Sequence, residues 1–164
     1  MVEREFYEVI KDALEKQFKA RGADAHLEIT ADKRFSDRLK SRISDDIIFV
    51  FLKQASPDIT GFVEEQYYPK FIVVEVKEDK IKLDDIYQLK KYADLFNAYF
   101  AFLISLEPVP EEIKRLFKSN VLLRSKLTSS YLQAFALARF DSANHEFVDW
   151  FEENPFENDV YWKR

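Results

Sequence analysis

The chain has 164 residues, enough for one domain, and 47% of them are hydrophobic. The sequence contains no cysteine, which excludes disulfides, thiol nucleophiles and cysteine-ligated metal clusters, and its two glycines exclude glycine-rich phosphate-binding loops. The apolar run at residues 47–52, like every other apolar run in the sequence, is far shorter than the roughly 20 residues of a membrane-spanning helix. Since no signal sequence opens the chain, we expect a soluble, cytoplasmic protein that does not act in a membrane.

The net charge is −5, which argues against a protein that binds nucleic acid by bulk electrostatic attraction. The charge is unevenly distributed along the chain. Residues 141–164 contain two basic and seven acidic residues, whereas residues 113–140 contain six basic residues and no acidic one. The average therefore conceals basic stretches that are able to contact an anionic partner.

The first third of the chain predicts one helix and one strand. Apolar residues recur with helical spacing over residues 2–20, and Gly22 is suited to end that helix. Residues 31–46 are polar and basic and show no clear period. The run at 47–52 (IIFVFL) is β-branched and aromatic, which favours a strand over a helix.

The rest of the chain alternates strands with helices. Two strands at 56–63 and 71–77 are joined through Tyr-Tyr-Pro, and Asp84 and Asp85 can cap a helix that runs to about Asn97. The remaining predictions are a strand at 99–105, a helix at 110–119, a strand that begins at 121–124, and two segments at 131–140 and 145–154 that fit helix or strand equally. This order predicts a single α/β domain over residues 1–164, with a mixed central sheet flanked by helices.

Three polar residues on the two central strands form the candidate site. Asp58 and Glu75 are 17 positions apart, which leaves room for a strand, a turn and a returning strand. Side chains alternate along a strand, so Glu75 and Lys77 lie on one side while Val74 and Val76 lie on the other. An aspartate on the neighbouring strand can then meet Glu75 and form a pair of oxygen ligands, which Mg²⁺ prefers. A lysine ammonium beside such a metal can orient or deprotonate an attacking water and offset developing phosphate charge.

Ordinary interpretations of these residues remain open. Pro-Asp is a common turn dipeptide, and a glutamate and a lysine two apart can form a solvated strand pair. The FIVVEVK strand is otherwise apolar on both faces, however, and burying two charged side chains there costs free energy unless they are used. Glu64 and Glu65 lie between Asp58 and Glu75 in the sequence and are alternative ligands.

The pattern Asp58-x16-Glu75-x-Lys77 resembles the signature of the PD-(D/E)XK nuclease superfamily, over about residues 2–106. The resemblance implies the restriction-endonuclease-like fold and a metal-dependent nuclease that acts on DNA or RNA. In that case Asp58, Glu75 and the Val76 carbonyl would hold Mg²⁺ or Mn²⁺, and Lys77 would activate or position water.

Two further features strengthen the resemblance. Gln88 and Tyr92 are four apart on a helix and look like the Gln-x-x-x-Tyr motif of the exonuclease-like branch, which lies near the metal and helps to position it or the DNA. Glu3 is the only acidic residue inside the apolar stripe of the first helix, whereas Glu8 and Glu15 point the opposite way. The segment beginning at Glu3 (EREF) resembles the start of archaeal Holliday-junction resolvases, in which this glutamate faces the metal site. A packed tyrosine and a helix-terminal glutamate are the alternatives.

The basic stretches are candidates for contacts with DNA phosphates, and a solvated face is the alternative. The candidates are Lys33, Arg34, Arg38, Lys40, Arg42, Lys114, Arg115, Lys118, Arg124 and Lys126. His26 and His145 have no motif around them, so we expect no zinc site. Residues 141–164 form an acidic, aromatic C-terminal extension that should dock on its own domain or on a second subunit, which makes a homodimer one alternative.

The sequence therefore predicts a nuclease, with two alternatives from other classes. One is a non-catalytic DNA-binding or assembly module that retains the same fold. The other is an interaction domain held together by its aromatic extension.

Overall fold

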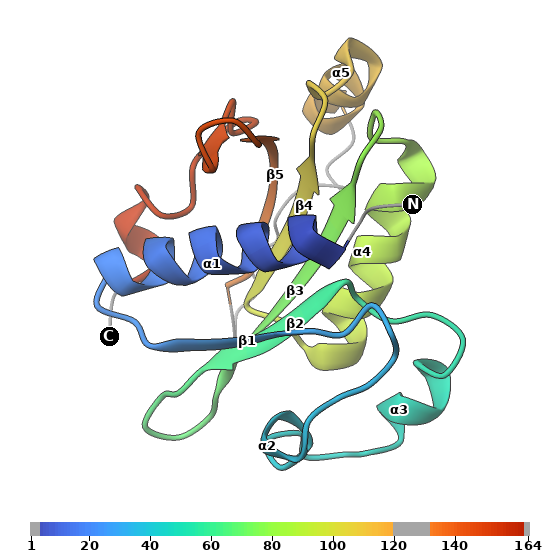
Figure 1. Ribbon diagram of the computed structural model, residues 1–164, viewed down its shortest axis with the longest axis vertical. Helices are drawn as coiled ribbons and strands as arrows, with labels where there is room; N and C mark the ends of the chain where they lie inside the picture. The colour runs from blue at the N-terminus through green and yellow to red at the C-terminus, as the bar shows by residue number, and fades with distance from the viewer. Residues whose placement is uncertain (1–3, 120–131, 163–164) are drawn as a thin grey trace.

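A computed structural model describes residues 4–119 and 132–162. It contains a mixed six-stranded sheet with the strand order β1-β2-β3-β4-β5-β6 (Figure 1). The strands are β1 (Ala25–Ile29), β2 (Ile59–Val63), β3 (Lys70–Lys77), β4 (Phe100–Ser105), β5 (Ala134–Asp141) and β6 (Glu146–Val148). The helices are α1 (Arg4–Ala20), α2 (Asp37–Lys40), α3 (Ile48–Phe51), α4 (Leu83–Phe96), α5 (Glu111–Ser119) and a 3₁₀ turn, η2 (Asp159–Tyr161).

The sheet combines antiparallel and parallel pairings. β1, β2 and β3 form an antiparallel meander, β3, β4 and β5 run parallel, and β6 returns antiparallel to β5. Parallel neighbours need a crossover connection, and α4 provides it between β3 and β4. The predicted α/β class and mixed sheet are therefore confirmed.

Each face of the sheet has its own hydrophobic core. On one face, α1 packs Leu14 and Phe18 against strand residues that include Val74 (Figure 1). On the other face, α4 packs Leu89 among residues that include Val73. Alternation along β3 separates these two sets and places Glu75 on the same side as Val73, facing α4.

Most predicted elements are present with shifted ends. Gly22 has a φ of 76° and its N–H donates to the Lys19 carbonyl oxygen at 2.9 Å, so it ends α1 as expected. The two ambiguous segments contain β5 and β6. β1 was not predicted, and the strand predicted to begin at 121–124 lies outside the described residues. Across the part of the chain described here, no helix combines the length and apolarity that a membrane crossing requires.

The predicted strand at residues 47–52 is wrong, because this run contains the short helix α3. The Asp45 carboxylate accepts a hydrogen bond from the backbone N–H of Ile47 at 3.1 Å and turns the chain at the start of the run. Phe49 packs against the core beneath α4, whereas Phe51 is 65% exposed. The β-branched and aromatic composition of the run favoured a strand, but the run is only partly buried.

The C-terminal segment docks on its own chain. Phe156 and Tyr161 are buried in the core beneath α1, and the Phe156 ring meets the Phe18 ring edge-on with the centroids 5.0 Å apart. Trp162 lies against the same ring at 5.6 Å. The aromatic residues of this segment thus help to cover one face of the sheet.

Candidate functional site

The register of β2 and β3 brings Asp58 and Glu75 together. Ile59 pairs with Val74, so Asp58, the residue before β2, lies opposite Glu75. A Glu75 carboxylate oxygen accepts a hydrogen bond from the Asp58 backbone N–H at 3.2 Å. The Asp58 carboxylate in turn accepts one from the Val76 backbone N–H at 2.7 Å. The two acids are therefore held beside each other by the backbone of both strands.

Both carboxyl groups lie where a negative charge is unfavourable. Glu75 is 2% exposed, and its burial together with the adjacent Asp58 carboxylate raises its pKa to about 8, although Lys77 acts in the opposite direction. Burial also raises the pKa of Asp58, against the Val76 N–H and the Lys77 ammonium. The pair resists ionisation and would gain stability from a nearby cation.

Lys77 supplies one positive charge at the edge of this pair. Its ammonium lies 3.7 Å from a Glu75 carboxylate oxygen and 3.3 Å from an Asp85 carboxylate oxygen. Burial lowers the pKa of Lys77, but Glu75 and Asp85 outweigh that effect and hold it above its ordinary value. Asp85 also accepts a hydrogen bond from the Lys82 N–H at 2.8 Å, so it caps α4 from the N3 position while it orients Lys77.

Tyr7 reaches the site from α1 and was not among the predicted residues. Its hydroxyl donates to the Asp58 carboxylate at 3.3 Å, on the oxygen that does not accept from Val76. Burial and the Asp58 charge together raise the pKa of Tyr7, so the hydroxyl keeps its proton. Its one sequence signal is its position four residues after the candidate Glu3, which does not show whether its hydroxyl reaches Asp58.

Gln88 and Tyr92 contact each other as the helical spacing predicts. The Gln88 amide donates to the Tyr92 hydroxyl at 2.9 Å, and the tyrosine side chain is fully buried. Burial and the negative charge of Glu75 raise the pKa of Tyr92 to about 12. The pair thus lies beneath the site on α4, and its role in aligning the site remains a prediction. Glu3 lies outside the described residues.

A pocket of about 350 Å³ opens beside Asp58 and Lys77. It is lined by Tyr7, Asp58, Val76, Lys77, Glu78, Asp79, Lys80, Lys82 and Asp85. Lys80 and Lys82 are exposed at the pocket, beside the equally exposed Glu78 and Asp79.

The donor atoms present fit a hard divalent cation. Among residues 4–119 and 132–162 no group of three or more His, Cys, Asp or Glu side chains is arranged to hold a metal. Asp58 and Glu75 nevertheless provide two adjacent carboxylates beside the Val76 backbone, and Mg²⁺ commonly takes one or two carboxylates and keeps several waters. A cation beside the pair would offset the cost of ionising both carboxyl groups.

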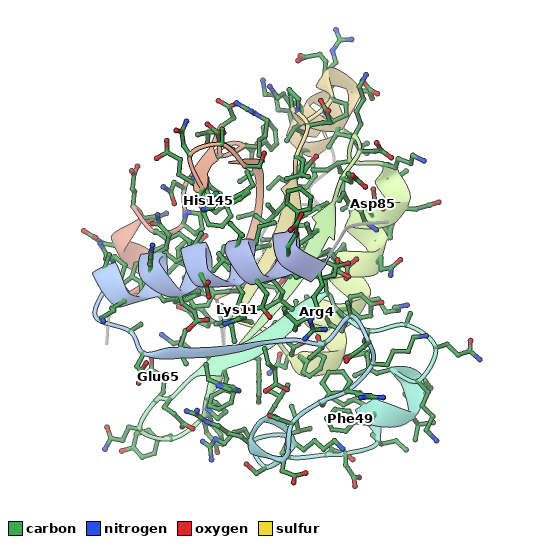
Figure 2. All side chains as sticks on the ribbon, in the orientation of Figure 1. Arg4, Lys11, Phe49, Glu65, Asp85 and His145 are labelled. Carbon is green, nitrogen blue, oxygen red and sulfur yellow. The ribbon has the colours of Figure 1, made fainter. Side chains whose placement is uncertain are left out.

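The alternative ligands Glu64 and Glu65 are at the wrong end of the hairpin. Glu64 pairs with Arg42 at 3.0 Å and Glu65 pairs with Lys70 at 3.2 Å, beyond the end of β2 that is distant from Asp58. Figure 2 shows Glu65 and Asp85 on opposite sides of the molecule. Asp58 and Glu75 are therefore the adjacent carboxylates, and their role as metal ligands remains a prediction.

The predicted basic residues do not form one surface. Lys33, Arg34, Arg38, Lys40 and Arg42 surround α2, whereas Lys114, Arg115 and Lys118 belong to α5. Figure 1 shows these two helices at opposite ends of the molecule. Arg124 and Lys126 lie outside the described residues. The predicted phosphate-contacting residues are therefore divided between two separate clusters.

The two histidines lie apart from the carboxylate pair. His26 lies on β1, with its ring nitrogen 2.7 Å from a Glu28 carboxylate oxygen. The His145 ring stacks near Phe140, with the centroids 6.4 Å apart. Neither residue lines the pocket over Asp58.

Comparisons with protein-family models, with curated proteins and with solved structures return no match for this chain.

Proposed function

We propose that this protein is a metal-dependent nuclease of the PD-(D/E)XK superfamily, with the restriction-endonuclease-like fold, that hydrolyses phosphodiester bonds in DNA. The observation that carries the proposal is the contact between Asp58 and the buried Glu75, with the Lys77 ammonium 3.7 Å from the Glu75 carboxylate, where Asp58 and Lys77 line an open pocket. Two adjacent acids and one lysine beside an open pocket are the groups that metal-assisted hydrolysis of a phosphodiester requires.

Each residue has a defined task in this proposal. A Mg²⁺ or Mn²⁺ ion held by Asp58, Glu75 and the Val76 carbonyl would supply an activated water and stabilise charge on phosphate. Lys77 orients that water or neutralises the phosphate oxygens, because its ammonium faces the pocket and keeps its proton. Glu3, Gln88 and Tyr92 support the arrangement.

A purely structural role for the pair is energetically unattractive. An aliphatic pair of similar size in place of Asp58 and Glu75 would remove the cost of burying two acids, at the expense of the hydrogen bonds that the Asp58 and Val76 N–H groups donate to these carboxylates. Buried carboxyl groups with raised pKa values next to an open pocket are more typical of a functional site than of a structural ion pair.

The test is cleavage of labelled supercoiled, linear duplex and single-stranded DNA with Mg²⁺, Mn²⁺ or EDTA. We expect cleavage with either metal, none in EDTA, and none by Glu75→Gln or Asp58→Asn. Glu146→Gln, an equally conservative change on the exposed edge strand β6, is the matched control and should cleave normally. Metal-dependent cleavage by Glu75→Gln would refute the proposal. Binding of DNA and Mn²⁺ without cleavage by the wild type would indicate a non-catalytic module instead.

A further inference from the structure

The loop that joins β2 to β3, residues 64–69, carries two adjacent tyrosines in solvent. Tyr67 is 79% exposed and Tyr68 is 82% exposed, more than any other large hydrophobic side chain in the described part of the chain. We call this loop the tyrosine loop. Aromatic rings left this accessible are available to stack on another planar group, and two neighbouring rings are more than the scattered exposure expected of an ordinary surface.

A basic segment, residues 31–42, connects the carboxylate pair to the tyrosine loop. The segment begins next to the site, because the Thr30 N–H donates to the Asp58 carbonyl oxygen at 2.9 Å. It ends at the loop, where Arg42 pairs with Glu64 at 3.0 Å. Between these points the Arg38 guanidinium lies 5.8 Å from the Phe62 ring centroid. Figure 1 shows α2 and the β2–β3 hairpin at the same end of the molecule.

The charge along this path is positive. Residues 31–42 contain five basic and two acidic side chains. Lys33, Arg34 and Lys40 are exposed and pair with no carboxylate among residues 4–119 and 132–162. The two glutamates of the tyrosine loop are both paired with basic residues, Glu64 with Arg42 and Glu65 with Lys70, so they do not cancel this charge. The path therefore combines phosphate-binding groups with aromatic faces.

The dimensions suit one nucleic-acid strand. The five residues of β2 separate Asp58 from the tyrosine loop, which corresponds to about 17 Å at the usual rise per residue. A few nucleotides cover this distance. In a duplex the base faces are covered by neighbouring bases, so exposed aromatic rings can stack only on bases of an unpaired strand.

The geometry points to single-stranded DNA as the occupant of this path: Tyr67 and Tyr68 stack on its bases, Lys33, Arg34 and Lys40 contact its phosphates, and the strand leads to Asp58 and Glu75. The inference rests on the proposed function for its choice of DNA. It narrows the substrate to DNA with an unpaired segment.

Binding is measured by fluorescence anisotropy in EDTA, where cleavage cannot occur, with labelled oligothymidylate and a duplex of the same length. We expect the single strand to bind more tightly. Tyr67→Ala with Tyr68→Ala should weaken its binding about 10- to 100-fold, since base stacking on an aromatic side chain contributes about 1–3 kcal/mol. The double phenylalanine variant, which keeps both ring faces, should bind within about threefold of the wild type. Phe51→Ala, an exposed aromatic residue on α3, is the matched control and should change nothing.

Charge is tested separately through the salt dependence. Lys33→Gln with Arg34→Gln should weaken single-strand binding and reduce the slope of log affinity against log salt by about 1.4, since each lost phosphate contact reduces it by roughly 0.7. The control is Lys16→Gln with Lys19→Gln, two exposed lysines on α1, which packs on the other face of the sheet.

The outcomes separate this inference from the proposed function. Tighter binding of the duplex, or unchanged binding by the double alanine variant, overturns the inference even if the protein cleaves DNA. Tighter binding of oligouridylate than of oligothymidylate would make RNA the occupant and would also overturn it. Tyrosine-dependent binding of the single strand without cleavage in Mg²⁺ supports it while refuting the nuclease.

Discussion

β3 has a glutamate–lysine ion pair at each end, and the two pairs differ in their surroundings. At its first residue, Lys70 lies 3.2 Å from Glu65, and about a quarter to a third of both side chains is exposed. At its last residue, Lys77 lies 3.7 Å from Glu75, whose side chain is only 3% exposed. The same two residue types, joined by one strand, thus occupy a solvated environment and a buried one.

The difference shows what burial adds to an ion pair. The Lys70–Glu65 pair is screened by water and contributes little to stability, as exposed pairs usually do. The Glu75 carboxyl has lost its hydration and lies beside a second acid, so it resists ionisation even with Lys77 nearby. The first pair is an ordinary surface feature, whereas the second carries a cost that a catalytic role would explain.

The largest difference between the two ion pairs is expected in the rate of DNA cleavage. Lys77→Met should lower the rate of DNA cleavage at saturating substrate about 100-fold or more, the usual cost of removing a group that stabilises charge in the transition state. Lys70→Met removes the same charge from the other end of β3 and should change that rate by less than about twofold. Single-turnover cleavage with Mg²⁺ measures both. Equal losses in the two variants would remove the functional distinction between the two pairs.

The two ion pairs should also differ in how they affect the pH dependence of the free energy of unfolding. The pKa of Glu75 rises from its ordinary 4.5 to about 8 on folding, so the folded state holds a proton that the unfolded state has released. Below pH 4.5 both states are protonated and the group contributes nothing. Between 4.5 and 8 the free energy of unfolding falls as pH rises, and above 8 the full cost of a few kcal/mol is present.

Urea unfolding in EDTA at several pH values tests this prediction. Glu75→Gln should flatten the decline and should be more stable than the wild type at pH values above 8. Glu65→Gln, at the solvated pair, should leave the profile unchanged. A wild-type profile that does not fall across this range would show that Glu75 is already ionised in the folded, metal-free protein.

The sequence predicted how Asp58, Glu75 and Lys77 are placed, but it did not predict the whole fold or the whole site. Strand alternation placed Glu75 and Lys77 on one side of β3, and the hairpin brought Asp58 opposite Glu75, because both follow from local periodicity and a short connection. The strand predicted at residues 47–52 was wrong because contacts outside the run determine its structure. Its composition suits a strand, but the turn at Asp45 and packing beneath α4 produced a helix that periodicity alone does not reveal.

Two residues of the site were missed in the sequence because tertiary placement decides whether they reach it. Asp85 was predicted as a helix cap, and nothing local showed that the start of α4 would bring it within 3.3 Å of Lys77. Tyr7 belongs to a helix whose angle across the sheet determines that its hydroxyl reaches Asp58. Residues brought to a site by a neighbouring element need the fold before they can be recognised.

Substitution of Tyr7 should have the smallest and most specific effect, a modest loss of Mn²⁺ affinity. Tyr7→Phe deletes the hydroxyl that donates to the Asp58 carboxylate and leaves the ring in place. A hydrogen bond to a charged group typically contributes about 1.5–3 kcal/mol, but the 3.3 Å length of this bond indicates a weaker contact, so we expect about a three- to tenfold loss in Mn²⁺ affinity. Calorimetric titration of the purified variant measures that loss directly.

The cleavage assay then distinguishes a positioning role from a catalytic one. If Tyr7 acts only by orienting Asp58, the Tyr7→Phe variant should need a higher Mn²⁺ concentration for half-maximal cleavage but should reach a nearly normal rate when the metal is saturating. Tyr87→Phe, which removes the hydroxyl of a half-exposed tyrosine on α4, is the matched control and should alter neither quantity. A lower maximal rate at saturating Mn²⁺ would instead place the Tyr7 hydroxyl in contact with the reacting phosphate or water. Unchanged Mn²⁺ affinity would show that the backbone N–H of Val76 is sufficient to hold Asp58 in place.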